Sequence, residues 1–185
     1  MCGGKSSRMG KDKGLLIKVN QTWAQLAFEK LFTITSSVKI SVNNPQKELY
    51  QKLFPNESLF IDSIDISGPL AGILSAHIQY PNLDFLILAC DMTDIKIAIL
   101  QQLVKEYKTK KEVYDFFVFK NEGVFEPLLG IYTRKGLEKI IKIYEADQLK
   151  KYSLKYVLEA GNTCAIELTE NQKKEFKNYN EATDL

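Results

Sequence analysis

The chain has 185 residues, 45% hydrophobic and 26% charged, a composition typical of one globular domain with a full core. Its formal net charge of +2 argues against a general binder of nucleic acids or membrane surfaces, so anions must be recognised by local clusters of charge. Three scattered cysteines, a single histidine and no apolar run of membrane length argue against a zinc site and a membrane span, and they favour the reducing cytoplasm.

The first feature in chain order is a basic loop at residues 2–13. Gly3 and Gly4 can turn backbone N–H groups toward anionic oxygens, and Arg8 and Lys13 can supply positive charge to a triphosphate. The run fits neither the P-loop pattern nor the dinucleotide-binding GxGxxG pattern, which disfavours both classes of protein. The composition predicts a phosphate-binding loop and leaves a flexible, solvated basic loop as the alternative.

Strands and helices are predicted to alternate along the rest of the chain. Apolar or β-branched runs predict strands, and apolar residues at helical spacing predict helices. The expected order is helix 22–32, strand 37–42, helix 45–53, strand 59–61, helix 69–80, strand 84–90, helix 95–107, strand 115–119, turn 120–123, strand 128–132, helices 135–144 and 147–159, and strand 164–168. This order predicts an α/β fold with a three-layer, doubly wound, mostly parallel sheet of the Rossmann-like kind, which binds ligands at the carboxyl ends of its strands.

Two aspartates follow predicted strands directly. Asp91 ends the apolar run at residues 85–90, and Asp62 ends the run at residues 59–61. Mg²⁺ prefers hard oxygen ligands and commonly takes one or two protein carboxylates together with substrate phosphates, so Asp91 is the candidate metal ligand. The alternative is that both aspartates are ordinary turn residues.

These residues resemble the molybdenum cofactor guanylyltransferases, which are MobA-like nucleotidyltransferases. The resemblance runs through five ordered segments over nearly the whole chain. Residues 3–10 and 12–16 are similar to the family signature LAGGxSxRMGxDKxLL, and Asp62 with residues 68–73 is similar to its D…GPLAGI segment. Residues 89–92, 126–132 and 176–180 resemble its CDMP, PLLALY-like and FxNIN segments.

The resemblance implies a magnesium-dependent transfer of GMP from GTP to the terminal phosphate of molybdopterin, with release of pyrophosphate. Backbone groups of Met1, Cys2 and Gly3 would contact the nucleotide. Lys13 would bind its phosphates and Asp91 would ligate Mg²⁺. Arg8, with Lys13, would offset the charge on pyrophosphate.

The resemblance also assigns residues to the base and to the acceptor. Asn43 and Asp62 would contact the base or ribose, and Asn178 and Asn180 would face the pterin. The guanine pocket would be lined by a loop that contains Gly68, Pro69, Leu70 and Gly72. We expect one domain over residues 1–185, with a nucleotide-binding half at about 1–92 and an acceptor half at about 93–185.

The chain departs from the family pattern at several positions. Asp12 stands where related cytidylyl and sugar nucleotidyl transferases usually have proline, which favours the guanylyl branch, and Thr93 stands where the family often has proline. Tyr179 replaces a small aliphatic residue. A phosphate-binding loop of this kind must follow a strand, but only Met1 and Cys2 precede Gly3. We therefore expect the natural polypeptide to begin several residues upstream.

The expected reaction partners are GTP and molybdopterin, with transient protein partners from molybdenum cofactor synthesis. We expect a cytoplasmic protein that is monomeric rather than oligomeric and that binds neither nucleic acid nor membrane. Two other functions stay open, namely cytidylyl transfer to the same pterin and a nucleotide-binding adaptor without transfer activity.

Overall fold

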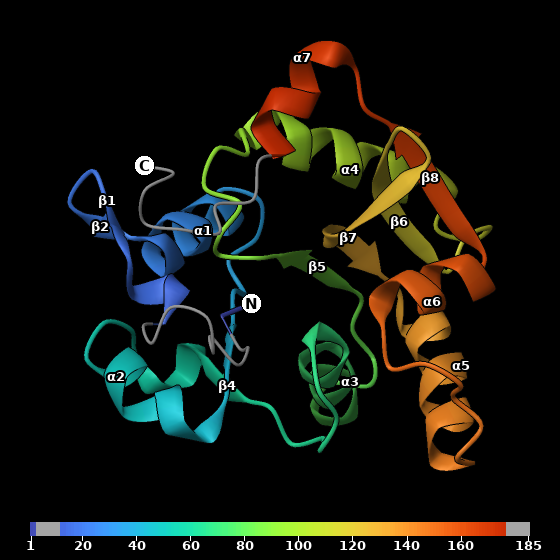
Figure 1. The fold of residues 1–185 in the computed structure, drawn as a ribbon, viewed down its shortest axis with the longest axis horizontal. Coiled ribbons are helices and arrows are strands. Elements are labelled where there is room, and N and C mark those ends of the chain that lie inside the picture. Colours follow the sequence, from blue (N-terminus) through green and yellow to red (C-terminus); the bar gives the residue numbers. More distant parts are fainter. Residues whose placement is uncertain (3–11, 177–185) are drawn as a thin grey trace.

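The computed structural model describes residues 1–2 and 12–176 (Figure 1). The strands are β1 (Ile17–Lys18), β2 (Gln21–Thr22), β3 (Ile40–Val42), β4 (Leu59–Ile61), β5 (Phe85–Leu88), β6 (Phe116–Asn121), β7 (Val124–Tyr132) and β8 (Thr163–Glu167). The α-helices are α1 (Trp23–Phe32), α2 (Lys47–Gln51), α3 (Pro69–Gln79), α4 (Ile97–Lys110), α5 (Arg134–Glu145), α6 (Leu154–Ala160) and α7 (Glu170–Lys173). Short 3₁₀ turns lie at Lys13–Leu15, Asn44–Gln46, Asn56–Ser58 and Lys174–Phe176.

The main sheet has the strand order β5-β7-β6-β8. Since β7 is antiparallel to both β5 and β6, and β8 is parallel to β6, three of these four strands run the same way. A second sheet pairs β3 with β4 in parallel. The predicted mostly parallel sheet is therefore confirmed, with β7 as the reversed strand.

Met1 and Cys2 lie between the two sheets. The amino group of Met1 donates to Leu88 O at 2.7 Å, and Cys90 N donates to Met1 O at 3.2 Å. On the other side, Cys2 N donates to Ser41 O at 3.0 Å. These two residues therefore connect the end of β3 to the end of β5 as a strand would.

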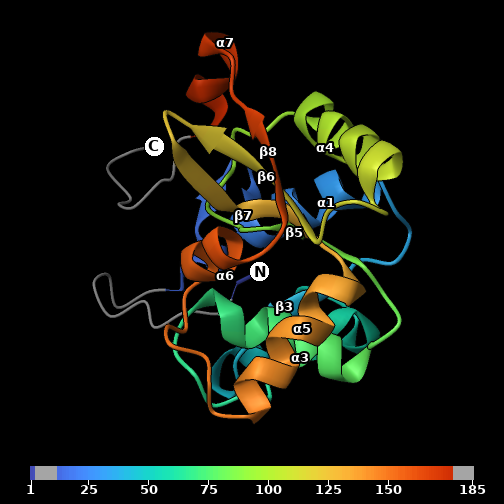
Figure 2. The same cartoon turned by 90° about the vertical axis from the view of Figure 1, so that its right-hand side faces the viewer.

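Helices cover both faces of the main sheet, which gives the predicted three layers. The side chains of β6 alternate, so Phe116 and Val118 pack with α3, α5 and α6, whereas Phe117 and Phe119 pack with α4. Figure 2 shows α3 and α5 on one side of the strands and α4 on the other. This core fixes the carboxyl ends of β5, β6 and β8 at one edge of the main sheet.

Most predicted elements are confirmed, with differences at their ends. Strand 59–61 has the predicted bounds, and the turn before Val124 joins β6 to β7 as a hairpin, with positive φ at Glu122 and Gly123. The helix predicted at 147–159 is wrong in its first half, because Asp147 has a φ of 55° and the Ser153 side chain caps a helix that begins at Leu154. The hairpin β1–β2 and helix α7 were not predicted. Over the described residues, no helix is long and apolar enough to cross a membrane.

Candidate functional site

Four chain segments end at the same edge of the sheets. Asn43 follows β3 and Asp62 follows β4, while Asp91 lies three residues after β5. Met1 and Cys2, which precede residues 3–11 in the sequence, lie between β3 and β5. In α/β sheets, this edge at the carboxyl ends of parallel strands is where ligands bind.

Lys13 and Asp91 meet at this edge. Lys13 Nζ lies 3.5 Å from Asp91 Oδ2, and the two side chains keep 28% and 18% of their surface exposed. Asp91 Oδ1 is buried and has no hydrogen-bond partner among the described residues. A buried carboxylate oxygen without a partner needs a water or an ion to satisfy it, and Lys13 places a positive charge beside this carboxylate.

Asp12 anchors the end of the basic loop. One carboxylate oxygen accepts from Gly14 N at 2.9 Å and from the Tyr50 hydroxyl at 3.0 Å, and the other accepts from Gln46 Nε2 at 2.6 Å. Gln46 Nε2 also donates to Cys2 O at 3.1 Å. The buried side chain of Gln46 therefore holds both the residue before and the residue after segment 3–11.

Gly14 is required by this anchor because a side chain would not fit. A Cβ atom at this position would lie 2.0 Å from the Tyr50 hydroxyl oxygen, and Tyr50 is fully buried. We expect Gly14→Ala to lower the free energy of unfolding by about 1–3 kcal/mol, the usual cost of overpacking. Urea unfolding monitored by circular dichroism measures this change.

The matched control for Gly14→Ala is the double variant with Tyr50→Phe. Removing the hydroxyl removes the nearest clash, so the two changes should be less destabilising together than their separate costs predict. Strictly additive costs would contradict the proposed contact between Gly14 and Tyr50.

Asp62 is oriented by β3 and α3. Its Oδ1 accepts from the Ser41 hydroxyl at 2.7 Å, and Ser75 Oγ of α3 accepts from the next two backbone N–H groups, of Ser63 and Ile64. Partial burial raises the pKa of Asp62, and the hydrogen bond from Ser41 opposes that rise. Asp62 is therefore held in one orientation at the same edge as Asn43.

Gly72 leaves the space that Asp62 and Ser41 occupy. A Cβ atom on Gly72 would lie 2.7 Å from Ser41 Oγ and 3.1 Å from Asp62 Oδ1. We expect Gly72→Ala to displace Asp62 and to weaken binding of GTP, the nucleotide that the resemblance implies, by roughly 10-fold, the equivalent of about one hydrogen bond to a charged group. Calorimetric titration with GTP measures the effect, and Ser67→Ala, at an exposed position nearby, is the control.

The start of α3 differs from the predicted guanine pocket in one respect. Gly68 and Pro69 are exposed, and Gly68 has a φ of 92°, which favours glycine before the proline that begins the helix. The side chain of Leu70, however, is fully buried in the core with α5 and α6. Only the backbone of Leu70 is therefore available to contact a base.

The segment after Asp91 has Thr93 where the family often has proline, and it contacts two lysines. Lys18 Nζ forms an ion pair with Asp94 at 2.7 Å and donates to Thr93 Oγ1 at 3.0 Å. Lys30 Nζ of α1 donates to the carbonyl oxygen of Thr93. Thr93 thus connects the segment that carries Asp91 to the N-terminal region.

Several predicted site residues have other partners or lie outside the described residues. Asn43 Oδ1 accepts from Gln46 N at 3.1 Å and caps a 3₁₀ turn, while the N–H of Cys2 already donates to Ser41 O. A nucleotide contact through the Cys2 N–H is therefore not available. The predicted residues that lie outside the described ranges are Gly3, Gly4, Arg8, Asn178 and Asn180.

The sequence analysis did not predict roles for Ser41, Gln46 or Tyr50. The capping box formed by Asn43 and Gln46 was visible as an Asn-x-x-Gln spacing, but it predicts only a local turn. Their contacts with Asp12, Cys2 and Asp62 span 21 to 44 residues, and no local pattern reveals them.

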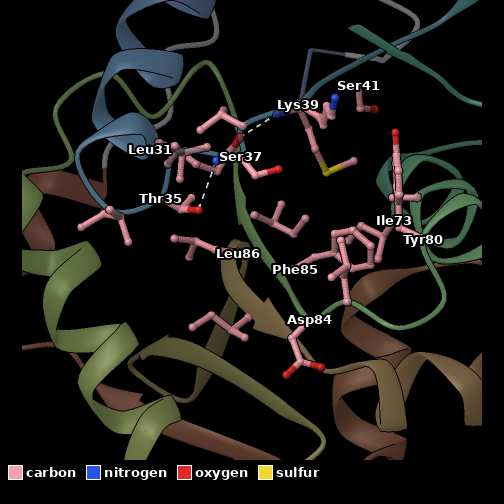
Figure 3. A pocket seen from close by; sticks show the side chains of 18 of the residues that line it. Leu31, Thr35, Ser37, Lys39, Ser41, Ile73, Tyr80, Asp84, Phe85 and Leu86 are labelled. Carbon is pink, nitrogen blue, oxygen red and sulfur yellow. Dashed lines mark hydrogen bonds between the residues drawn. The ribbon is translucent and has the colours of Figure 1, made fainter. Parts of the chain in front are cut away.

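A cavity of about 380 Å³ lies beside this site, between β3 and β5. Figure 3 shows side chains from β3, α3 and β5 around it, including Ser41, Ile73 and Phe85. Its lining is mainly apolar, so it does not suit a triphosphate. The polar edge that contains Lys13, Asp62 and Asp91 carries the charged groups that the cavity lacks.

Comparisons with known proteins indicate the family of this chain. Residues 1–161 match the family model of the MobA-like NTP transferase domain. A probable molybdenum cofactor guanylyltransferase of Flavobacterium johnsoniae is 30% identical over 100% of this chain and 92% of its own length. One from Methanosarcina mazei is 29% identical over 100% of this chain and 86% of its own.

Solved structures share the fold. Molybdopterin-guanine dinucleotide biosynthesis protein A from Archaeoglobus fulgidus superposes with a TM-score of 0.73 at 20% identity, covering 99% of this chain and 91% of its own. A CMP:2-keto-3-deoxy-manno-octonic acid synthetase complexed with CTP has a TM-score of 0.66 at 12% identity, covering 90% and 86%.

Proposed function

Because this chain belongs to the MobA-like NTP transferase family, we propose that it transfers GMP from GTP to the terminal phosphate of molybdopterin and releases pyrophosphate. The product is the guanine dinucleotide form of the molybdenum cofactor. The full-length similarity to probable guanylyltransferases supports the choice of GTP over CTP.

One observation carries the proposal, namely the approach of Lys13 to Asp91. The two residues are 78 positions apart in sequence, and their charged atoms lie 3.5 Å apart at the edge where segment 3–11 begins and ends. If Asp91 were an ordinary turn residue, or if the basic loop were simply solvated, the two charged groups would have no need to lie close together. A metal–triphosphate complex does, because its metal needs a carboxylate and its phosphates need a cation.

The reaction needs alignment and neutralisation of charge more than proton transfer. The terminal phosphate of the acceptor is already an anion at neutral pH and attacks the α-phosphorus of GTP in line, while pyrophosphate leaves. Lys13 offsets the charge that accumulates on pyrophosphate, and Arg8 is proposed to assist it. No histidine is required, and His77, buried in α3, is not assigned a role.

The residues present fit a magnesium ion. Asp91 offers a hard carboxylate oxygen without a hydrogen-bond partner, and the described residues contain no cluster of three or more side chains that could hold a metal alone. Mg²⁺ characteristically takes one or two carboxylates and completes its shell with water and substrate phosphates. When bound, it would polarise the α-phosphorus, and Asp91 would orient it.

The rest of the site is proposed from the resemblance to the family. Asn43 and Asp62 contact the base or ribose, and the backbone of Gly68 to Gly72 lines the guanine pocket. The acceptor half at about residues 93–185 presents Asn178 and Asn180 to the pterin. We propose that the enzyme works as a cytoplasmic monomer that receives its acceptor from transient protein partners.

Calorimetric titration with GTP, CTP and ATP, each with and without Mg²⁺, tests the nucleotide. We expect GTP to bind tightest and only weakly without the metal. Preferred binding of CTP would replace the proposal with cytidylyl transfer.

Release of pyrophosphate from GTP and molybdopterin tests the transfer itself. We expect release that depends on both substrates. Magnesium-dependent GTP binding without release of pyrophosphate would indicate an adaptor.

A further inference from the structure

Cys2 and Cys90 lie side by side at the site. Met1 N donates to Leu88 O, and Cys90 N donates to Met1 O. In a parallel pair, this pattern puts Met1 opposite Ala89 and Cys2 beside Cys90. Residues in register on neighbouring strands point to the same face, so the two thiols face one another.

The contact between the thiols agrees with this register. The hydrogen bond from the Cys90 thiol lowers the pKa of Cys2 to about 7, although burial acts in the opposite direction. Tyr50, whose hydroxyl donates to Asp12, also lies beside Cys2 and acts in the same direction on its pKa. The residue Cys2 keeps part of its surface exposed, whereas Cys90 is 6% exposed, so we assign the first reaction with an oxidant to Cys2.

Both cysteines are next to groups that the proposed reaction uses. Cys2 is the last described residue before segment 3–11, and its carbonyl is held by Gln46. Cys90 immediately precedes Asp91, the proposed metal ligand. A covalent bond between the two sulfurs would therefore act on the residue before segment 3–11 and on the residue before Asp91.

We infer that Cys2 and Cys90 form a reversible disulfide that switches off nucleotide binding. The oxidant that we propose is hydrogen peroxide, which takes two electrons from the two thiols. The Cys2 thiolate attacks one peroxide oxygen, the O–O bond breaks, and a sulfenic acid forms as hydroxide leaves and is protonated to water. The Cys90 thiol then attacks this sulfur, the S–S bond forms, and a second water leaves, so two thiols and one peroxide give one disulfide and two waters.

The disulfide narrows the gap between the two strand ends. A disulfide requires Cβ atoms about 3.5–4.5 Å apart, which is closer than most neighbouring positions across a sheet. We expect oxidation to draw the end of β5 toward Cys2, which would move Asp91 relative to Lys13. The effect on nucleotide binding rests on the proposed function, whereas formation of the bond does not.

Counting thiols tests the bond itself. The full chain is treated with hydrogen peroxide, denatured and alkylated, and its intact mass is measured. The chain has three cysteines, all free in this structure, so we expect alkylation to fall from three thiols to one and the mass to fall by about 2 Da before alkylation. Peptide mapping should join Cys2 to Cys90.

Cys164 provides the matched control. It lies in β8 away from the site, and burial raises its pKa. Cys164→Ser should still form the bond, whereas Cys90→Ser and Cys90→Ala should not. Retention of all three thiols after oxidation, or a bond that includes Cys164, would overturn the inference.

Titration with GTP and Mg²⁺ tests the switch separately. We expect oxidation to weaken binding by about 10-fold or more, because a shift of about 1 Å in an aligned site can cost up to 10²-fold. Dithiothreitol should restore it, and Cys90→Ser and Cys90→Ala should bind GTP equally well before and after peroxide. A Cys2–Cys90 bond that leaves GTP binding unchanged would overturn the switch, and failure of the reduced protein to bind GTP would instead count against the proposed function.

Discussion

Asp91→Asn is expected to lower the turnover of pyrophosphate release by roughly 10²-fold or more, the scale seen when one electrostatic stabiliser is removed from an active site. The amide keeps the shape of the side chain but removes its negative charge. It therefore tests the charge that would hold Mg²⁺, and not the packing at the end of β5. Steady-state rates at saturating GTP and Mg²⁺ measure the change.

The control for this variant is Asp94→Asn, three residues further along the same segment. Asp94 pairs with Lys18 and is not assigned to the metal, so its substitution should change turnover far less. Turnover of Asp91→Asn at the wild-type level in saturating Mg²⁺ would remove Asp91 from the site.

Lys13→Ala should weaken GTP binding and turnover together, each by roughly 10- to 100-fold, because a hydrogen bond to a charged group contributes about 1.5–3 kcal/mol. The proposed contact is with phosphates that stay bound as the reaction proceeds, so both the ground state and the transition state lose it. Calorimetry gives the Kd for GTP, and pyrophosphate release gives kcat and KM.

Lys13→Arg separates charge from shape. An arginine keeps the charge but presents a planar fork in place of a compact ammonium, so it should recover part of the binding and less of the turnover. Normal values for both binding and turnover in Lys13→Ala would exclude Lys13 from the phosphate site.

The fold was accessible from the sequence because its elements carry strong local patterns. The apolar run before Asp91 and the β-branched run before Asn43 both belong to buried strands that end at the ligand-binding edge. Helix 147–159 was predicted incorrectly because its apolar spacing continues across residues 147–153. The start signal at Ser153 and the left-handed backbone at Asp147 act against that pattern.

The site was only partly accessible for a different reason. Lys13 and Asp91 could be named because each stands in a distinctive local context. The residues that hold the loop could not, since Gln46 and Tyr50 read as ordinary helix residues until the fold brings them to Asp12. The resemblance used Asp12 only to favour the guanylyl branch. It did not predict that Asp12 anchors the end of the loop through Gln46 and Tyr50.

A double-mutant cycle on Lys13 and Asp91 tests the central claim most directly. Turnover is measured for the wild type, Lys13→Ala, Asp91→Asn and the double variant at saturating Mg²⁺. If the two residues bind one metal–triphosphate complex, we expect a coupling free energy of at least about 1 kcal/mol. The double variant should then lose less turnover than the losses of the two single variants combined predict. Effects that add to within about 0.5 kcal/mol would show two independent sites and contradict the account.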